Sequence, residues 1–210
     1  METVQILADA KKSEFQEIAY LHIKEINHGL LPFLGPKLLS ELYKALLEIN
    51  IIHIWAIKSD NRIIGFLAGT LSFKKNALCL LLKRKSKLVI SMMMQLFGNP
   101  RSTHMMISLI KNKAMSVFSR KSGNRTHQAE LLAIAVDKQS QGSGIGKVLI
   151  SCFEAFVREA RLSEYGVMTN INETGSNAFY RAMGFKEHSS IPHHNLVLRV
   201  YIKQLDRLKL

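Results

Sequence analysis

The chain has 210 residues, of which 47% are hydrophobic, so it is long enough to form one domain with a sizeable core. Its two cysteines, Cys79 and Cys152, are far apart and match neither a disulfide framework nor a metal-binding spacing, which favours a reducing compartment. The formal net charge is +13, and the N-terminal Met-Glu-Thr-Val-Gln lacks the basic start and apolar core of a signal peptide, so we expect a cytoplasmic protein.

The first 73 residues alternate between strand and helix patterns. Period-two patterns predict strands at Thr3–Ala8, Ile51–Ile57 and Ile63–Phe73. Helical spacing of apolar residues predicts a helix that begins with a capping box at Ser13 and Gln16, and the same spacing predicts a second helix over Pro36–Ile49.

Residues 74–128 interrupt this alternation. They contain 12 of the 29 Lys and Arg residues and no Asp or Glu, so the rest of the chain is close to neutral. Apolar runs at Ala77–Leu82 and Leu88–Phe97, followed by a helical pattern at Met105–Phe118, predict a helical insertion. Neither run reaches the roughly 20 residues that span a bilayer, so we do not expect a transmembrane hairpin.

An apolar strand pattern at Glu130–Val136 leads into a glycine-rich turn and then an amphipathic helix. Free backbone N–H groups and the positive end of the helix dipole make such a turn suitable for binding phosphate. The spacing excludes a Walker loop, because Gln141 stands five positions before Gly146 and Val148 replaces the magnesium-binding hydroxyl. It also excludes a dinucleotide loop, because Lys147 or Leu149 occupies the third glycine position.

Two motifs now suggest a family. Gln141-x-x-Gly144-x-Gly146 resembles the acetyl-CoA signature Arg/Gln-x-x-Gly-x-Gly/Ala of the GNAT N-acetyltransferases. Further along, the sequence predicts a strand at Tyr165–Asn172, a short helix at Asn177–Met183 and a last strand at Asn195–Ile202. The residues around the short helix carry a second resemblance to the same family: Asn172 is followed by Asn177-Ala-Phe-Tyr180 and then by Gly184-Phe185. The two motifs lie at the family's interval and cover roughly residues 130–187.

The resemblance implies an α+β GNAT fold in a single N-acetyltransferase domain over residues 1–210. A mixed, mostly antiparallel central sheet would be flanked by helices, and residues 74–128 would form a basic helical insertion between the third and fourth strands. The Glu130–Val136 strand would then be the fourth strand of that sheet.

The resemblance also implies acetyl-CoA as the acetyl donor, with no metal. Glycines would let the backbone approach the pyrophosphate, while Gln141 and Lys147 add side-chain donors. The pantetheine arm would run beside the strand as an added neighbour, with Asn172 or Asn177 on its other side. The predicted cofactor-binding residues are Ile134, Ala135, Val136, Gln141, Gly142, Ser143, Gly144, Ile145, Gly146, Lys147, Asn172 and Asn177.

Acetyl transfer to an amine needs a base, because a lysine-like amine has a pKa of about 10.4. Glu130 matches the catalytic glutamate of histone-type members of the superfamily, and a buried glutamate would have a raised pKa; the alternative is a charged residue at a strand edge. Tyr180 matches the family's general-acid tyrosine; the alternative is a core aromatic. His22, His28 and His127 are reserve candidates for the base; the alternative is that each is an ordinary surface or loop histidine. Neither cysteine stands in a nucleophile-like context, so direct attack in a ternary complex is expected.

The acceptor is not specified by any motif. We expect a small primary amine, such as an amino sugar or a nucleotide- or lipid-linked sugar, with protein lysines or N-termini as the alternative. A further alternative is a CoA-binding or membrane-associated regulatory module with little catalysis. Residues 74–128 could attract an anionic substrate, contact the anionic inner face of a membrane, or cap the core. Nucleic acid is not favoured, because Phe97 and Phe118 are the only aromatic residues among these charges.

Overall fold

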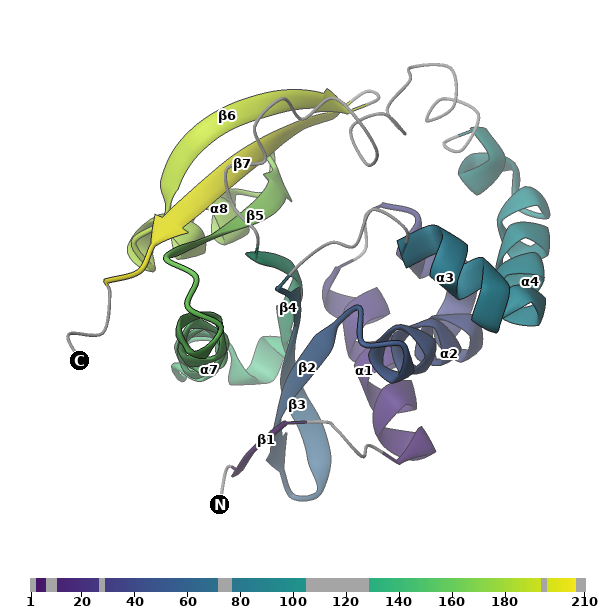
Figure 1. Ribbon diagram of the computed structural model, residues 1–210, viewed down its shortest axis with the longest axis horizontal. Helices are drawn as coiled ribbons and strands as arrows, with labels where there is room; N and C mark the ends of the chain where they lie inside the picture. The colour runs from purple at the N-terminus through teal and green to yellow at the C-terminus, as the bar shows by residue number, and fades with distance from the viewer. Residues whose placement is uncertain are drawn as a thin grey trace.

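A computed structural model of the chain describes residues 3–6, 11–26, 29–71, 77–104, 129–193 and 196–206 (Figure 1). Within these ranges, seven strands form one sheet in the order β1-β2-β3-β4-β5-β7-β6. Every neighbouring pair is antiparallel except β4 and β5, which are parallel. The predicted α+β class, with a mixed and mostly antiparallel sheet flanked by helices, is confirmed.

The N-terminal half follows the predicted alternation. Its elements are β1 (Thr3–Ile6), α1 (Lys12–Glu25), the 3-10 helix η1 (Leu31–Leu34), α2 (Gly35–Glu48), β2 (His53–Ser59) and β3 (Arg62–Thr70). The start of α1 differs from the predicted capping box at Ser13 and Gln16. The helix begins after Lys11, whose backbone N–H donates to Glu14 Oε2 at 2.5 Å.

The two faces of the sheet are covered by different helices. Because side chains alternate along a strand, Ile54 and Ala56 of β2 face α1 and α2, while Trp55 and Ile57 face α7 (Ile145–Glu159). Figure 1 shows α1 and α2 on one side of β2–β4 and α7 on the other. The protein therefore has two hydrophobic clusters with β2–β4 between them.

Two glycines of β3 let α7 lie close to the sheet. A Cβ at Gly69 would lie 2.5 Å from the ring of Phe153, and a Cβ at Gly65 would lie 2.7 Å from Ile145 Cγ2. Both contacts are shorter than atoms can approach, so a side chain at either position would force α7 away from β3. The two glycines therefore fix the distance between β3 and the start of α7, and with it the position of the turn that precedes α7.

The C-terminal half consists of β4 (Ala129–Val136), η2 (Lys138–Ser140), α7, β5 (Glu164–Asn170), α8 (Thr174–Ala182), β6 (Lys186–His193) and β7 (Leu196–Gln204). The sequence predicted all of these helices and strands except η2 and β6. The segment that forms β6 contains polar residues without a clean alternation, and it includes Pro192, which is tolerated because β6 is an edge strand.

Where the structure describes them, the residues between β3 and β4 are helical in α3 (Ala77–Arg84), in α4 (Ser86–Phe97) and over residues 100–104. The helical insertion between the third and fourth strands is therefore confirmed, while the helix predicted at Met105–Phe118 lies outside the described residues. Leu81 and Leu96 join the cluster beneath α1 and α2. Among the helices that the structure describes, none is long and apolar enough to cross a bilayer.

A buried carboxylate connects α7 to the C-terminal strands. Glu154 accepts a hydrogen bond from the Tyr165 hydroxyl at 2.9 Å and pairs with Lys203 Nζ at 2.5 Å. Arg158 of the same helix lies 3.6 Å from the second carboxylate oxygen. Since each partner satisfies part of the buried charge, removing one of them would leave an uncompensated carboxylate.

The close approach of α7 to β3 gives the first prediction. Gly69→Ala should lower the free energy of unfolding by about 1–3 kcal/mol, because the new methyl group overlaps the ring of Phe153. Urea denaturation followed by circular dichroism measures the change. The matched control is Gly175→Ala in the first turn of α8, where a Cβ would meet nothing within 4 Å. Equal stability of the two variants would contradict this account of the packing.

Candidate functional site

The parallel pairing of β4 and β5 is short. Ala129, Glu130 and Leu131 pair with Tyr165, Gly166 and Val167, and beyond them β4 pairs with β3 alone among the described strands. Figure 1 shows β5 turning away from β4 together with β6 and β7. The later residues of β4 therefore present an open edge in the middle of the sheet, where backbone N–H and C=O groups need partners.

A bulge in β4 lies where the two strands separate. Ala68 pairs with Ala133 and Gly69 pairs with Leu131, so Leu132 is an extra residue without a partner in β3. Its side chain is exposed. A bulge bends its strand and increases the local twist, which accounts for the departure of β4 from β5 at this point.

A cavity of about 540 Å³ lies beside the open edge, and its size is typical of a ligand site. Four segments line it: the end of β4, the turn before α7, the start of α7, and α8 with the residue before it. Of the residues predicted from the two motifs, it brings together Ile134, Ala135, Val136, Gln141, Gly142, Gly144, Ile145, Gly146, Lys147 and Tyr180. The predicted residues Glu130, Ser143, Asn172 and Asn177 do not line it.

The three glycines of the turn have different roles. Gly142 and Gly144 have φ of +83° and +91°, a conformation that disfavours a side chain, and Gly144 is the residue that precedes α7. Gly146 lies inside the helix, where a Cβ would be 3.1 Å from the ring of Phe179 in α8. The first two glycines shape the turn and the third allows α8 to pack on it, and the first three residues of α7 line the cavity.

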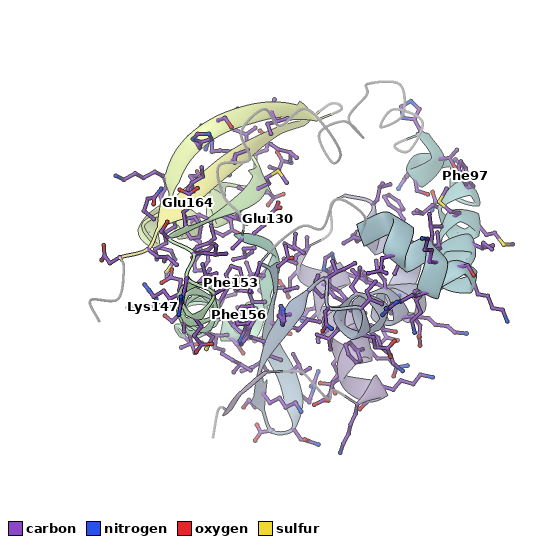
Figure 2. All side chains as sticks on the ribbon, in the orientation of Figure 1. Phe97, Glu130, Lys147, Phe153, Phe156 and Glu164 are labelled. Carbon is purple, nitrogen blue, oxygen red and sulfur yellow. The ribbon has the colours of Figure 1, made fainter. Side chains whose placement is uncertain are left out.

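The turn is braced by side chains that the sequence assigned to the ligand. Gln141 Nε2 donates to the Val136 carbonyl at 3.0 Å and to Glu25 Oε2 of α1 at 3.4 Å. Ser143 Oγ donates to the Ser140 carbonyl at 2.7 Å. Lys147 has no acidic partner among the described residues and is the exposed cation at this end of α7 (Figure 2).

The end of α1 also holds the start of the turn. Lys24 Nζ lies 2.7 Å from Asp137 Oδ2, and the Asp137 carboxylate also accepts the Gln139 N–H at 3.0 Å. The hydrogen bond from Lys24 holds the pKa of Asp137 below its usual value. Both side chains are in contact with solvent, so the pair positions the turn more than it stabilises the protein.

Tyr180 reaches the cavity from α8. Its ring packs edge-on against Phe185, with the ring centroids 5.4 Å apart, and none of the described residues is hydrogen-bonded to its hydroxyl. Burial raises the pKa of Tyr180 above its usual value. The phenol therefore stays protonated at neutral pH and can donate a hydrogen bond into the cavity.

Glu130 is buried at the start of β4, beside Thr70 of β3 and Gly166 of β5. Its neighbour Leu131 belongs to the cluster around α7, so Glu130 faces the opposite side of the sheet. Figure 2 shows it at the start of β4 next to β5, where the two strands still pair. Glu130 thus lies at the closed end of the opening, while the glycine turn lies at the other end of β4.

Asn177 is placed differently from the prediction. It is buried, its Nδ2 donates to the carbonyls of Asn170 and Glu173 at 2.8 and 2.7 Å, and its Oδ1 accepts from the Tyr201 hydroxyl at 3.0 Å. Both ends of the amide are therefore used to attach α8 to β5 and β7. Because the amide is engaged in this way, we expect Asn177 to support α8 and not to contact the cofactor.

Asn172, the other residue expected beside the arm, is exposed in the turn before α8. The cavity is lined here instead by Glu173, Ser176 and Phe179. Ser176 lies four positions before Tyr180 on α8, so helical periodicity from Tyr180 was the signal that could have identified it. No comparable pattern in the sequence points to Glu173.

The histidines proposed as reserve bases do not enter the cavity where they are described. His22 is buried, its Nδ1 lies 2.7 Å from the Tyr43 hydroxyl, and its ring stacks on Phe66, so it is a core residue. His28 and His127 lie outside the described residues. In the described ranges there is also no group of three or more His, Cys, Asp or Glu side chains that could hold a metal ion.

Comparisons with known proteins agree with this geometry. Residues 109–187 match the family model described as an acetyltransferase (GNAT) domain. No curated protein gives a significant sequence match. The fold is similar to that of a protein from Desulfovibrio desulfuricans assigned to the GNAT acetyltransferases, at 12% identity, with 98% and 100% of the two chains covered and a TM-score of 0.58.

Two further solved structures share the fold. The ribosomal-protein-S18-alanine N-acetyltransferase from Escherichia coli is 10% identical, with 100% and 99% of the two chains covered and a TM-score of 0.57. A chain from the NatC complex bound to Gag peptide and CoA is 12% identical, with 98% and 99% covered and a TM-score of 0.58.

The hydrogen bonds of Asn177 give the second prediction. Asn177→Ala should lower the free energy of unfolding by about 1–2 kcal/mol, because it removes the acceptor of the Tyr201 hydroxyl proton and two hydrogen bonds to the carbonyls of Asn170 and Glu173, although both carbonyls keep a backbone N–H donor. Urea denaturation measures this, and calorimetry on the folded variant should find acetyl-CoA affinity unchanged. Asn172→Ala is the control for stability. A stable Asn177 variant that has lost acetyl-CoA binding would restore the ligand role.

Proposed function

We propose that the chain is a GNAT acetyltransferase, as the domain match over residues 109–187 and the shared fold support, and that it transfers acetyl from acetyl-CoA to a primary amine in a ternary complex. One observation carries the proposal. A single cavity runs from the open edge of β4, past the glycine turn, to the hydroxyl of Tyr180. Its three parts correspond to the amide-bearing arm, the pyrophosphate and the thioester of the donor.

The donor half of the proposal rests on backbone groups. The pantetheine arm contains amides, which can pair with the open edge at Ile134–Val136 as an added strand would. The pyrophosphate would accept hydrogen bonds from the N–H groups that begin α7, where the helix dipole also favours an anion. Lys147 supplies the remaining positive charge, since Gln141 is occupied by the Val136 carbonyl.

The acceptor amine must lose a proton before it can attack, because its pKa of about 10.4 keeps it protonated at neutral pH. We assign this proton to Glu130, directly or through water, because it is a buried carboxylate on β4 one residue before the last residue that pairs with β5. The amine nitrogen then forms a bond to the thioester carbonyl carbon, and a tetrahedral intermediate results. Collapse of that intermediate breaks the carbon–sulfur bond and releases CoA as a thiolate.

Tyr180 is assigned to the departing thiolate as a hydrogen-bond donor. A thiol has a pKa of about 8.5, and that of a tyrosine is about 10 before burial raises it further, so full proton transfer from Tyr180 would be unfavourable by more than about 2 kcal/mol. A hydrogen bond from the neutral phenol has no such cost and stabilises the developing charge. The proton that finally reaches the sulfur comes from solvent or from the product amine.

The acceptor that we propose to test first is an amino sugar or a nucleotide- or lipid-linked sugar, and a lipid-linked acceptor would place the enzyme at the cytoplasmic face of a membrane. Acetylation of protein lysines or N-termini is the second candidate. Two proteins of similar fold are the ribosomal-protein-S18-alanine N-acetyltransferase and a chain of the NatC complex bound to Gag peptide and CoA, but at 10% and 12% identity they share the fold alone. A screen of amino sugars, peptides and polyamines with CoA release as the readout distinguishes the candidates.

A third prediction separates binding from turnover. Tyr180→Phe should lower kcat by about 100-fold and leave acetyl-CoA affinity nearly unchanged, because it removes only the donor to the leaving group. Gly144→Glu should instead abolish acetyl-CoA binding for two reasons. The new carboxylate repels the pyrophosphate, and a side chain is disfavoured at residue 144, where φ is +91°. Calorimetry measures the affinities and CoA release measures kcat. Loss of binding in the tyrosine variant, or unchanged binding in the glycine variant, would reject the assignment.

A fourth prediction concerns the base. Glu130→Gln should lower kcat/KM for the acceptor at least 100-fold near neutral pH. The pH–rate profile should lose the limb that comes from ionisation of the base, while acetyl-CoA affinity is retained. Glu173→Gln is the matched control, because that carboxylate lines the cavity near α8 and has no assigned proton to accept. If both variants keep the wild-type pH–rate profile, Glu130 is a structural residue. A protein that binds acetyl-CoA but acetylates no amine in the screen would favour a regulatory module.

A further inference from the structure

The helix α4 has apolar residues on two opposite faces. On its inner face Leu88, Val89, Met92 and Leu96 pack against the cluster beneath α1 and α2. On its outer face Ile90, Met94 and Phe97 are exposed by 58%, 72% and 49%, and Met93 is exposed beside them. A surface helix of a globular protein ordinarily has polar residues on its outer face, so this second apolar stripe needs a partner.

The stripe is continuous along the helix. Ile90, Met94 and Phe97 follow the i, i+4, i+7 spacing that places side chains above one another on one face. Leu82 of α3 is exposed as well and extends the apolar surface onto the neighbouring helix. Methionine side chains are flexible and adapt to irregular partners, which suits a fluid surface better than a fixed protein groove.

Positive charges surround the stripe. Lys83 and Arg84 end α3, Lys87 begins α4, and Arg101 follows the end of α4; all four are exposed, and none pairs with an acidic residue among those that the structure describes. Lys85 is different, because its Nζ lies 2.6 Å from Glu48 Oε2. The whole segment 74–128 contains no acidic residue that could neutralise this field.

We propose that the outer face of α4, with the cations that surround it, docks on an anionic lipid bilayer. Anionic headgroups complement Lys83, Arg84, Lys87 and Arg101, while the apolar stripe enters the boundary between headgroups and acyl chains. Two copies of the chain meeting through this face would bring like charges together. Nucleic acid would match the charges but would leave the apolar stripe without a partner.

Docking in this way leaves the acetyl-CoA cavity accessible. Figure 2 shows Phe97 and Lys147 at opposite sides of the molecule, so the bilayer and the pyrophosphate would lie at different ends. The docking face and the cavity use different elements, and the proposal is therefore independent of the assigned activity. It does favour acceptors that are themselves held at a membrane.

Flotation of the full chain with phosphatidylcholine vesicles, with and without phosphatidylglycerol, tests the proposal. We expect binding only to the vesicles that contain phosphatidylglycerol, with affinity falling as salt is added. Replacing Ile90, Met94 and Phe97 together by Ser should weaken partitioning at least about tenfold. Replacing Lys83, Arg84 and Lys87 by Gln should weaken it by about fivefold for each charge removed.

Matched controls come from the rest of the surface. Replacing the exposed cations Lys12, Arg62 and Lys186 by Gln, or the exposed Tyr20 by Ser, should leave partitioning nearly unchanged. Circular dichroism and acetyl-CoA affinity verify that each variant is folded. The proposal is overturned if the wild type ignores anionic vesicles, if the α4 variants bind like the controls, or if the face binds an oligonucleotide or a second copy in sedimentation but not the vesicles.

Discussion

The arrangement of this protein depends on one interruption in its sheet: β4 and β5 pair through only three residues and then separate. Backbone groups in the interior of a sheet normally bond to the next strand, so the end of β4 is left with donors and acceptors that a ligand or water must satisfy. The bulge at Leu132 produces the separation. An amide-bearing arm is the kind of ligand that can replace the missing strand, and the opening and the glycine turn line the same cavity.

An interrupted sheet needs other connections between its two halves. The helix α7 supplies one of them, since it packs on β3 through Gly65 and Gly69 and reaches β5 and β7 through Glu154. Asn177 supplies the second by attaching α8 to β5 and β7. Both helices that border the cavity are thus fixed by buried contacts on the side away from it, so their cavity-facing groups are held in position before any ligand arrives.

The sequence identified residues that line the cavity better than it identified the contacts that support them. The glycine turn and Tyr180 could be recognised because their chemistry requires particular residues at a fixed spacing. Asn177 belongs to the same motif, yet spacing cannot distinguish a ligand from a buried amide that links two strands, and its role came only from its hydrogen-bond partners. The edge strand β6 was missed because its polar residues follow no alternation. His22 was only a reserve candidate for the base, and its burial against Tyr43 makes it a core residue.

Hydrogen exchange on the full chain, with and without acetyl-CoA, is the most direct test of the claim that a ligand replaces the missing strand. The amides of residues 133–136 at the end of β4, and those of residues 142–147 at the start of α7, should become protected when acetyl-CoA binds. The amides of α4 should be unaffected. Binding of acetyl-CoA with no added protection at residues 133–136 would contradict the account.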